Sequence, residues 1–210
     1  NDLELKFNGN VQNGYTLNVS GTDIDIRTSL HYVPKRFLSS IQSYQFDGTA
    51  DLNINLENKK KSKLPVAIHA DFKIENGSMQ SNLPWQTKAA EIQGVYHNGK
   101  HRNNRSSTVS LQSINCQING EYLKGSLTYS NFNNPYIQTQ FNTELDLADI
   151  KRWGYELPIQ EVSGRAKITA NYKGKIGLKN NIKKDFEQAE KSADIQLKNT
   201  SFLYKPFALF

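Results

Sequence analysis

Cysteine is nearly absent from this sequence. Cys116 is the only one in 210 residues, so no intrachain disulfide can form, and a small secreted domain stapled by disulfides is excluded. The absence leaves an envelope compartment open. Cys116 stands within an alternating apolar stretch and has no histidine near it in the sequence, a pattern typical of a small buried hydrophobic residue rather than a nucleophile.

Long apolar runs and low complexity are also missing. No stretch of 18 apolar residues could form a transmembrane helix, and no secretory signal peptide is recognisable. Six prolines in 210 residues argue against a low-complexity segment. The chain begins inside a strand-like stretch, "LELKF", and stops abruptly at "PFALF". We therefore expect it to be a fragment of a larger protein whose targeting segments are not included.

Catalytic and metal-binding signatures are absent as well. There is no G-x-S-x-G motif, Walker loop or Rossmann fingerprint. His97 and His101 have the i, i+4 spacing that binds zinc on a helix, but the intervening Asn98-Gly99 predicts a turn. Asp146 and Asp149 lack the third carboxylate and the glycine of a calcium loop, and are better explained as solvated acids at a helix N-terminus. We expect a protein that is not an enzyme and that has no metal and no cofactor.

The charge of the chain is mildly basic, with a formal net charge of +6 and a pI near 9.2. This favours anionic partners such as lipid headgroups or nucleic acid. The basic residues gather in expected turns: Lys59 to Lys61, Lys63, Lys100 to Arg105, and Lys183 with Lys184. Solvated loop tips that protect strand edges are the first interpretation of each cluster. Trp85, Trp153 and the tyrosines do not gather with these cations, so we expect no nucleic-acid partner.

The dominant pattern is an alternation of apolar and polar residues with period two, which predicts β-strands. In the segment 50–56, Ala, Leu, Ile and Leu alternate with Asp, Asn and Asn. Similar segments lie at 3–7, 17–19, 24–26, 68–74, 92–96, 109–118, 127–129, 137–147, 166–172 and 193–197. The spacing predicts about a dozen strands in an antiparallel meander.

Breaks in the alternation predict bulges and turns. The phase changes at 21–23, and again at Gln112-Ser113, where a bulge or turn would account for it. Asn76-Gly77 and Asn119-Gly120 carry the sequence typical of tight turns. Helices are few: the spacing of apolar residues favours short ones at 34–44, 147–154 and 181–193.

One unit recurs within the chain. "GTADLNINLEN", which starts at Gly48, returns as "GRAKITANYKG", which starts at Gly164, an offset of 116 (164 − 48). "ADFKIENGSMQSNLPW", from Ala70, is matched by "ADIQLKNTSFLYKPF", from Ala193, at an offset of 123 (193 − 70). A strand and a short helix are expected before each glycine. We interpret residues 24–130 and 137–210 as two copies of one repeat, the second truncated, within a single β-rich segment 1–210.

The order of these features resembles a known family. A strand, a short helix, a "G-x-A" strand, a charged loop, an "A-D-hydrophobic" strand, an "N-G-S" turn and a proline–aromatic pair are followed by "GSLTYSNFNNPYIQTQFNTELDLADIKRW", residues 125–153. This pattern is similar to the AsmA-like family of bacterial envelope proteins, relatives of TamB. The resemblance covers nearly the whole chain, although the family's motifs are degenerate. A full member also has an N-terminal anchor and a much longer chain.

The resemblance implies a fold and a function. It implies a membrane-anchored periplasmic protein with a long curled β-sheet and a hydrophobic groove, which acts in outer-membrane homeostasis and phospholipid transport, and which has no catalytic residues. The candidates that would line this groove are the apolar members of the alternating strands: Ala50, Leu52, Ile54, Ile68, Phe72, Ile74, Leu127, Tyr129, Ile137, Phe141, Leu145, Ala166, Ile168, Tyr172, Ile195 and Leu197.

Two architectures are compatible with the alternation. The same apolar residues would line a β-sandwich or a barrel, and on pattern alone these come first. A sheet of more than about ten strands also tends to curl, and a curled sheet could hold a ligand against its apolar face. The repeat and the resemblance favour the second arrangement: an all-β, mainly antiparallel, long curled sheet that forms an open hydrophobic groove, with two or three short helices.

The function that follows is non-enzymatic. We expect a periplasmic AsmA-like domain that binds or conducts lipid for outer-membrane biogenesis and is anchored to the inner membrane through a segment absent from this chain. Its partners would be a phospholipid or another acyl-chain ligand, bacterial membranes and neighbouring repeats of the parent chain. The alternative is a structural or adhesive β-sandwich repeat at a cell surface that binds protein or glycan through its loops.

Overall fold

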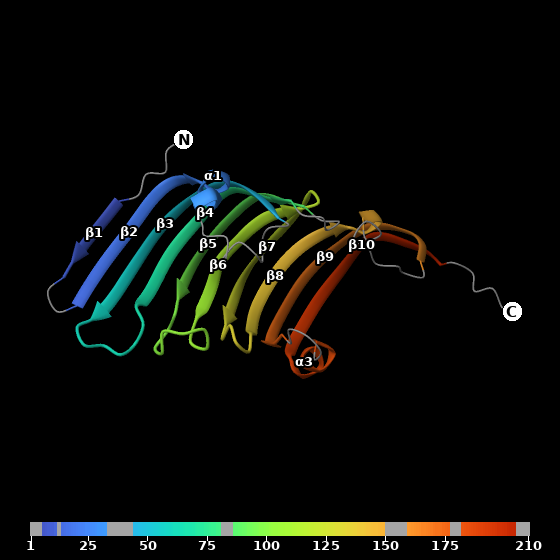
Figure 1. The fold of residues 1–210 in the computed structure, drawn as a ribbon. Helices are drawn as coiled ribbons and strands as arrows, with labels where there is room; N and C mark the ends of the chain where they lie inside the picture. Colours follow the sequence, from blue (N-terminus) through green and yellow to red (C-terminus); the bar gives the residue numbers. More distant parts are fainter. Residues whose placement is uncertain are drawn as a thin grey trace.

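The computed structural model describes residues 6–11, 14–32, 44–80, 86–149, 159–176 and 182–204. Ten strands form one antiparallel sheet in which every strand pairs with its neighbours in the sequence, from β1 at one edge to β10 at the other (Figure 1). The strands are β1 (Lys6–Asn10), β2 (Gly14–Asp25), β3 (Gln45–Lys59), β4 (Ala67–Gln80), β5 (Thr87–His97), β6 (Thr108–Ile118), β7 (Glu121–Ser130), β8 (Tyr136–Asp146), β9 (Ile159–Lys175) and β10 (Glu190–Tyr204).

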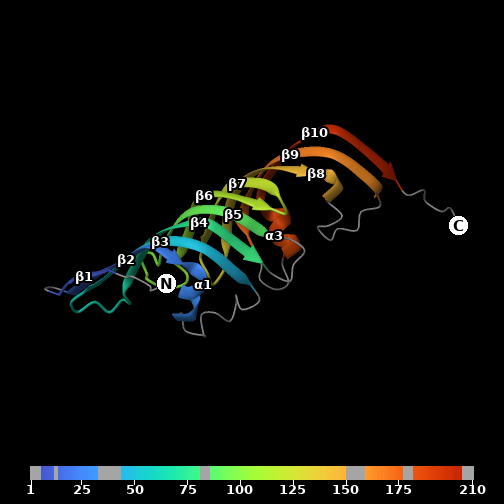
Figure 2. The same ribbon diagram turned by 90° about the horizontal axis from the view of Figure 1, so that it is seen from above.

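The sheet is curved and open. Figure 2 shows the strands bowed, with the two short helices on the concave side of the curve. β1 and β10 have one strand partner each, so the sheet does not close into a barrel. The predicted fold class is therefore confirmed: the chain is all-β and antiparallel, in a long curled sheet. The described residues contain ten strands rather than the predicted dozen.

In the described residues, helical structure is limited to short segments. Helix α1 (Ile26–Ser29) follows β2 directly, where the carboxylate of Asp25 accepts a hydrogen bond from the Thr28 backbone N–H at 2.6 Å. This cap satisfies a backbone N–H donor of the first helical turn. The strand therefore ends at Asp25, whereas the alternation predicted that it extends to Ile26. The 3₁₀ turn η1 (Leu30–Tyr32) comes next, and α3 (Ile182–Gln188) precedes β10.

The three predicted helices have different outcomes. Of the helix expected at 34–44, all but Tyr44 lies outside the described residues. At 147–154 only residues 147–149 are described, and they form a 3₁₀ turn. The helix at 181–193 is shorter than predicted because β10 already begins at Glu190, where pairing with Lys173 of β9 replaces the helical hydrogen bonds.

Bulges bend the strands at the expected phase changes. The pairing of β2 with β3 skips from Gly21 to Ile24, and Asp23 has a φ of 52°. The pairing of β6 with β7 skips from Leu111 to Ile114, which confirms the predicted bulge at Gln112-Ser113. An extra residue in one strand increases the local twist and bends the strand, so these positions help to curve the sheet.

The two expected Asn-Gly turns have different structures. Asn119 and Gly120, with φ of 52° and 93°, form the two-residue connection between β6 and β7, as predicted. Asn76-Gly77 is not a turn: β4 continues through it, with a bulge at Asn76, whose φ is 51°. The bulge lies opposite Gly48 of β3, so a left-handed asparagine accommodates an irregular pairing instead of reversing the chain.

The hydrophobic core formed by the described residues is small. The described residues that are buried and apolar are Ala70, Ala90, Cys116, Leu147, Val162 and Ala166. Leu147, Val162 and Ala166 form one cluster, with Ile168 packed against it. No large described side chain is fully buried. A domain stabilised by a second packed layer would bury several large apolar side chains, so one face of this sheet stays accessible.

Candidate functional site

The apolar residues of successive strands are brought to one face of the sheet. Directly paired residues in an antiparallel sheet point to the same side. Ile54 of β3 pairs with Val19 of β2 and with Ala70 of β4. The same row continues across the sheet through Tyr96, Val109, Tyr129 and Ile137. Seven strands therefore share one uninterrupted line of apolar side chains.

Parallel rows lie beside this one. Leu52 pairs with Phe72, and the row runs on through Gly94, Leu111 and Leu127 to Thr139 and Tyr172. A third row joins Ala50, Ile74, Ile92, Ile114, Gly125, Phe141, Ala170 and Ala193. Together the rows cover the sheet from β2 to β10. We call this surface the apolar face.

All sixteen residues expected to line a groove belong to the apolar face. Ile68 and Leu56 pair near one end of the strands, and Leu145, Ala166 and Leu197 form a row near the other end. Ile168 pairs with Ile195 between them. The pairing of the strands places all of these side chains on one face, whereas their contact with a ligand stays a prediction.

Sequence reasoning missed the contribution of β5 and β6. The apolar face also includes Ile92, Tyr96, Val109, Leu111, Ile114 and Cys116. The signal was present, because these residues alternate with polar ones. The bulge in β6 inverts the alternation between Leu111 and Ile114, so the two halves of that strand reach the same face only once the pairing is known.

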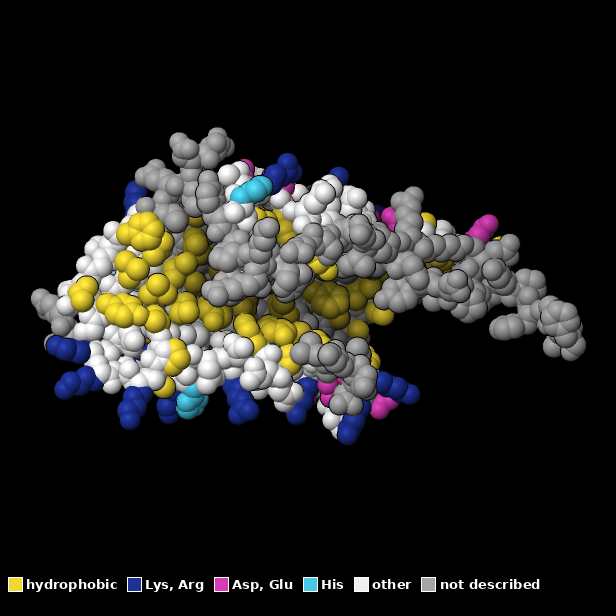
Figure 3. All heavy atoms as spheres, in the orientation of Figure 1, with side chains coloured by type: hydrophobic (Ala, Val, Ile, Leu, Met, Phe, Trp, Pro, Cys, Tyr) yellow, Lys and Arg dark blue, Asp and Glu magenta, His cyan; other side chains and the backbone are white. Residues whose placement is uncertain are grey.

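The apolar face is partly covered near its centre and exposed at its ends. Leu52, Phe72 and Leu127 are half-buried. Phe7 in β1 is 65% exposed and Ile195 in β10 is 58% exposed. Figure 3 shows hydrophobic side chains in a band across the face turned to the viewer, with lysines and arginines along its lower border. Contiguous apolar surface of this kind is unusual on a soluble monomer and marks a surface that binds something.

The opposite face is mainly polar. Asn55 donates to Asn18 at 2.8 Å, and Thr169 donates to Asn142 at 2.7 Å. The Arg165 guanidinium contacts Glu144 at 2.7 Å and Glu121 at 3.1 Å. These carboxylates raise the pKa of Arg165, and the hydrogen bond that Arg165 donates to Glu144 is the main cause. Cross-strand polar ladders of this sort suit a surface that faces water.

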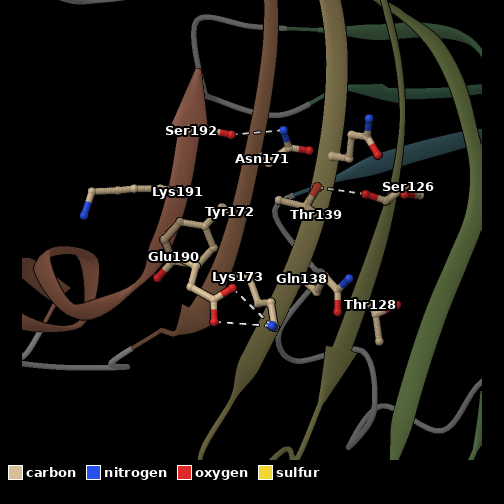
Figure 4. Close-up of a pocket in the computed structure, with 11 residues that line it drawn as sticks. Ser126, Thr128, Gln138, Thr139, Asn171, Tyr172, Lys173, Glu190, Lys191 and Ser192 are labelled. Carbon is tan, nitrogen blue, oxygen red and sulfur yellow. Dashed lines mark hydrogen bonds and ion pairs between the residues drawn. The ribbon is translucent and has the colours of Figure 1, made fainter. Parts of the chain in front are cut away.

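A shallow depression of about 490 Å³ lies on the polar side of β7 to β10 (Figure 4). Its polar groups pair with one another: Asn171 donates to Ser192 at 3.2 Å, and Lys173 contacts Glu190 at 3.2 Å. The described lining residues offer no buried, unpartnered donor or acceptor that would select a ligand. We therefore place the candidate site on the apolar face.

The reactive groups considered from the sequence do not assemble into a chemical site. Cys116 is buried beside Leu123 of β7, and burial raises the pKa of its thiol, which keeps it protonated and unreactive. His97 ends β5 and His101 lies in the following loop, with Asn98-Gly99 between them. Within the described ranges, no group of three histidine, cysteine or carboxylate side chains could hold a metal ion.

Neither of the two helices in the described part of the chain has the length and apolar character needed to cross a bilayer. Comparisons with protein-family models, curated proteins and solved structures gave no significant match to this chain.

Proposed function

We propose that this chain is a non-enzymatic lipid-binding segment of the AsmA-like type, in which the apolar face holds acyl chains along the concave side of the sheet. The observation that carries the proposal is the continuity of that face: paired apolar residues run without a polar break from Val19 in β2 to Ile137 in β8. The resemblance of residues 125–153 to that family supports the same function.

The energetics favour an acyl ligand. Burial of a methylene group is worth about 0.8 kcal/mol, so an acyl chain of roughly sixteen carbons gains on the order of 10 kcal/mol when it leaves water. Half-buried side chains such as Leu52 and Phe72 would lose their remaining exposure to water when a tail lies across them. Movement of lipid between two membranes also requires an apolar surface without interruptions, and the row from Val19 to Ile137 is such a surface across seven strands.

The proposal includes a location and partners. An AsmA-like segment would act in the periplasm, anchored to the inner membrane through another part of its parent protein, in phospholipid transport for outer-membrane biogenesis. The β-sandwich alternative needs a second sheet packed on the first. The described residues form one sheet, so no specific observation favours that alternative.

Binding of a fluorescent fatty acid to the purified chain tests the proposal. We expect saturable binding, and we expect Ile54→Asp and Ile168→Asp to weaken it by at least about tenfold, since each places a carboxylate on the apolar face. Asn55→Asp is the matched control for Ile54→Asp: it adds the same charge next to it on β3, but on the polar face. Circular dichroism checks that each variant is folded.

Two results would contradict the proposal. One is an equal loss of binding in Asn55→Asp and Ile54→Asp, which would assign the effect to net charge instead of the apolar face. The other is an absence of phospholipid from protein purified without detergent, measured by mass spectrometry of an organic extract, together with no saturable fatty-acid binding.

A further inference from the structure

Four loops form a basic edge along one side of the apolar face. In a meander, alternate connections lie at the same end of the strands, so the β3–β4, β5–β6, β7–β8 and β9–β10 connections share one border of the sheet. Together with the strand residues that flank them, these connections carry ten described basic residues against three acidic ones, Asp185, Glu187 and Glu190, and the β7–β8 connection contributes none of the ten. The basic residues are Lys59, Lys60, Lys61, Lys63, Lys100, Arg102, Arg105, Lys175, Lys183 and Lys184. We call this border the basic ledge; its cations line the lower border in Figure 3.

The basic ledge is one connected structure. Arg102 in the β5–β6 loop donates to the carbonyl oxygen of Pro65 at 2.8 Å and to Asn58 Oδ1 at 3.3 Å, which ties that loop to the β3–β4 connection. The buried Asn98 adds a bond to the Val66 carbonyl oxygen at 2.8 Å. Independent solvated loop tips would not require such links, so the two loops that carry most of these cations are held side by side.

Further links extend the row toward β10. The backbone N–H of Phe132 in the β7–β8 loop donates to the Asn104 carbonyl oxygen at 2.8 Å, and the N–H of Ile176 donates to the Pro135 carbonyl oxygen at 3.1 Å. The distance from the β3–β4 loop to the β9–β10 connection is six strand spacings, or roughly 29 Å. The basic ledge therefore presents its charge along an extended line.

The cations of the basic ledge are not neutralised by the protein. Within the described ranges, none of its ten basic side chains is in an ion pair. Some cations elsewhere on the sheet are paired: Arg27 contacts Asp47 at 2.7 Å, and Arg165 contacts two glutamates. Nine of the ten basic side chains are also exposed, Arg102 being the exception. Unpaired, exposed and aligned charge produces a positive potential that attracts an anionic surface.

Apolar side chains are interleaved with these cations. Leu64 lies next to Lys63 and is 45% exposed, and Phe186 in α3 is 54% exposed. Cationic residues with apolar residues between them are typical of surfaces that lie at the headgroup level of a bilayer. Single-stranded nucleic acid instead requires free aromatic faces for its bases. The Phe186 ring stacks with Tyr172 on one side and has the Lys191 ammonium 4.7 Å from its centroid, so its faces are engaged.

We infer that the basic ledge docks the protein on the surface of an anionic phospholipid bilayer, with this border of the apolar face toward the lipid. The inference goes beyond the proposed function because it assigns a membrane-contacting surface and an orientation. It also stands separately from that function, since the cations of the basic ledge can bind a bilayer whether or not the apolar face holds a tail.

Co-sedimentation with vesicles tests the inference. The purified chain is mixed with vesicles of phosphatidylcholine alone or with about 30% phosphatidylglycerol, a content that gives the surface a negative potential. We expect binding to the anionic vesicles only, and we expect it to fall as salt is raised from about 0.1 M to about 0.5 M because the charges are screened. Inorganic phosphate at millimolar concentration should not compete.

Charge-reversal variants locate the surface. Lys60→Glu, Lys63→Glu and Arg105→Glu combined should reduce vesicle partitioning by at least about tenfold, since three attractive charges become repulsive. The matched control is Lys88→Glu, Lys124→Glu and Lys198→Glu combined. It makes the same change in net charge on the polar face, where these residues pair with Gln117, Asn115 and Arg165. We expect it to retain most of the binding.

Each remaining outcome overturns the inference. Equal losses in the two triple variants would mean that net charge alone governs binding, and equal binding to both kinds of vesicle would exclude headgroup charge. Binding of single-stranded DNA that is tighter than vesicle binding, and lost in the first triple variant, would assign the basic ledge to nucleic acid. The first triple variant should keep its fatty-acid binding, so a failure here is distinguishable from a failure of the acyl-binding proposal.

Discussion

The ring of Phe72 in β4 lies directly over the backbone of Gly94 in β5. A methyl group added at Gly94 would lie 2.5 Å from Phe72 Cζ and 3.0 Å from Leu111 Cδ2. The two residues are direct partners across the strands, so the large ring occupies the space above its partner that lacks a side chain. An aromatic ring that covers a glycine in this way pins the register of both strands and closes a gap in the apolar face.

Phe72→Ala should destabilise the protein and leave its fold unchanged. The ring is only half-buried, so we expect the free energy of unfolding to fall by about 2–3 kcal/mol, less than for loss of a fully buried aromatic side chain. Urea denaturation followed by circular dichroism measures the change. Tyr122→Ala is the control, because Tyr122 is 60% exposed and pairs with Gln117 on the polar face. A loss for Phe72→Ala no larger than that of Tyr122→Ala would contradict this explanation.

Gly48 and Gly164 each lie opposite a β-bulge in the neighbouring strand. Gly48, with φ of 120°, lies opposite the Asn76 bulge, and Gly164, with φ of 105°, lies opposite a bulge at Asn199, whose φ is 50°. A methyl group at Gly48 would lie 3.0 Å from the Asn76 carbonyl oxygen, and one at Gly164 would lie 2.5 Å from that of Asn199. The two similar sequence segments, which start at Gly48 and Gly164, therefore form similar local structures. The repeat as a whole stays a prediction.

Alanine at either glycine should be costly. Each substitution combines a left-handed backbone with a collision against backbone atoms, so we expect Gly48→Ala and Gly164→Ala each to lower the free energy of unfolding by more than about 2 kcal/mol. Gly120→Ala is the control, since φ at Gly120 is 93° but no atom lies within 4 Å of the added methyl group. It should cost about 1 kcal/mol. Similar denaturation midpoints for all three variants would show that the close approach is unimportant.

The extent to which this fold follows from the sequence depends on the range of the interactions. Alternation is a local property, and it identified the strands and, through its phase changes, the bulge at Gln112. Asn76-Gly77 was assigned to a turn because this dipeptide readily adopts positive φ. Positive φ also occurs in bulges, and only the pairing with the partner strand, at Gly48, shows that the chain continues through a bulge and does not reverse. The single layer could not be predicted from alternation, since a face that packs on a second sheet has the same pattern.

The candidate site shows the same limit. The groove residues from Ala50 to Leu197 were placed on one face because alternation within each strand, combined with direct pairing between strands, is sufficient. The basic ledge was not foreseen as a unit. Lys63 and Lys100 lie in different loops, and only the meander order, with Arg102 bonded to Pro65, shows that these loops share a border.

Ionisation of the buried Cys116 thiol should lower the stability of the folded protein at alkaline pH. Burial raises the pKa of its thiol above the ordinary value of 9.0, so the folded state holds the proton more tightly than the unfolded state does. This contribution to stability is present below about pH 9 and is lost as pH rises through the higher pKa of the folded state. Urea midpoints across this range should fall more steeply for the native chain than for Cys116→Ala.

Thiol labelling gives an independent measurement of Cys116. We expect a disulfide reagent at pH 8 to react at least about tenfold more slowly with the folded chain than with the chain in urea, because a buried protonated thiol is a poor nucleophile. Comparable rates in the two conditions, or parallel pH profiles for the native chain and Cys116→Ala, would mean that the thiol is accessible to solvent in the folded state.

Ile195→Lys should reduce self-association. β10 is the last strand of the sheet, and Ile195 and Leu197 on its apolar face are 58% and 51% exposed. An edge strand with exposed apolar residues is a template for pairing with another copy, and an added lysine opposes such pairing through charge and solvation. Sedimentation velocity at several concentrations should show a smaller associated fraction for Ile195→Lys than for the native chain. Tyr122→Lys adds the same charge on β7, an interior strand, and should associate like the native chain; an equal reduction in both variants would assign the effect to net charge rather than to the β10 edge.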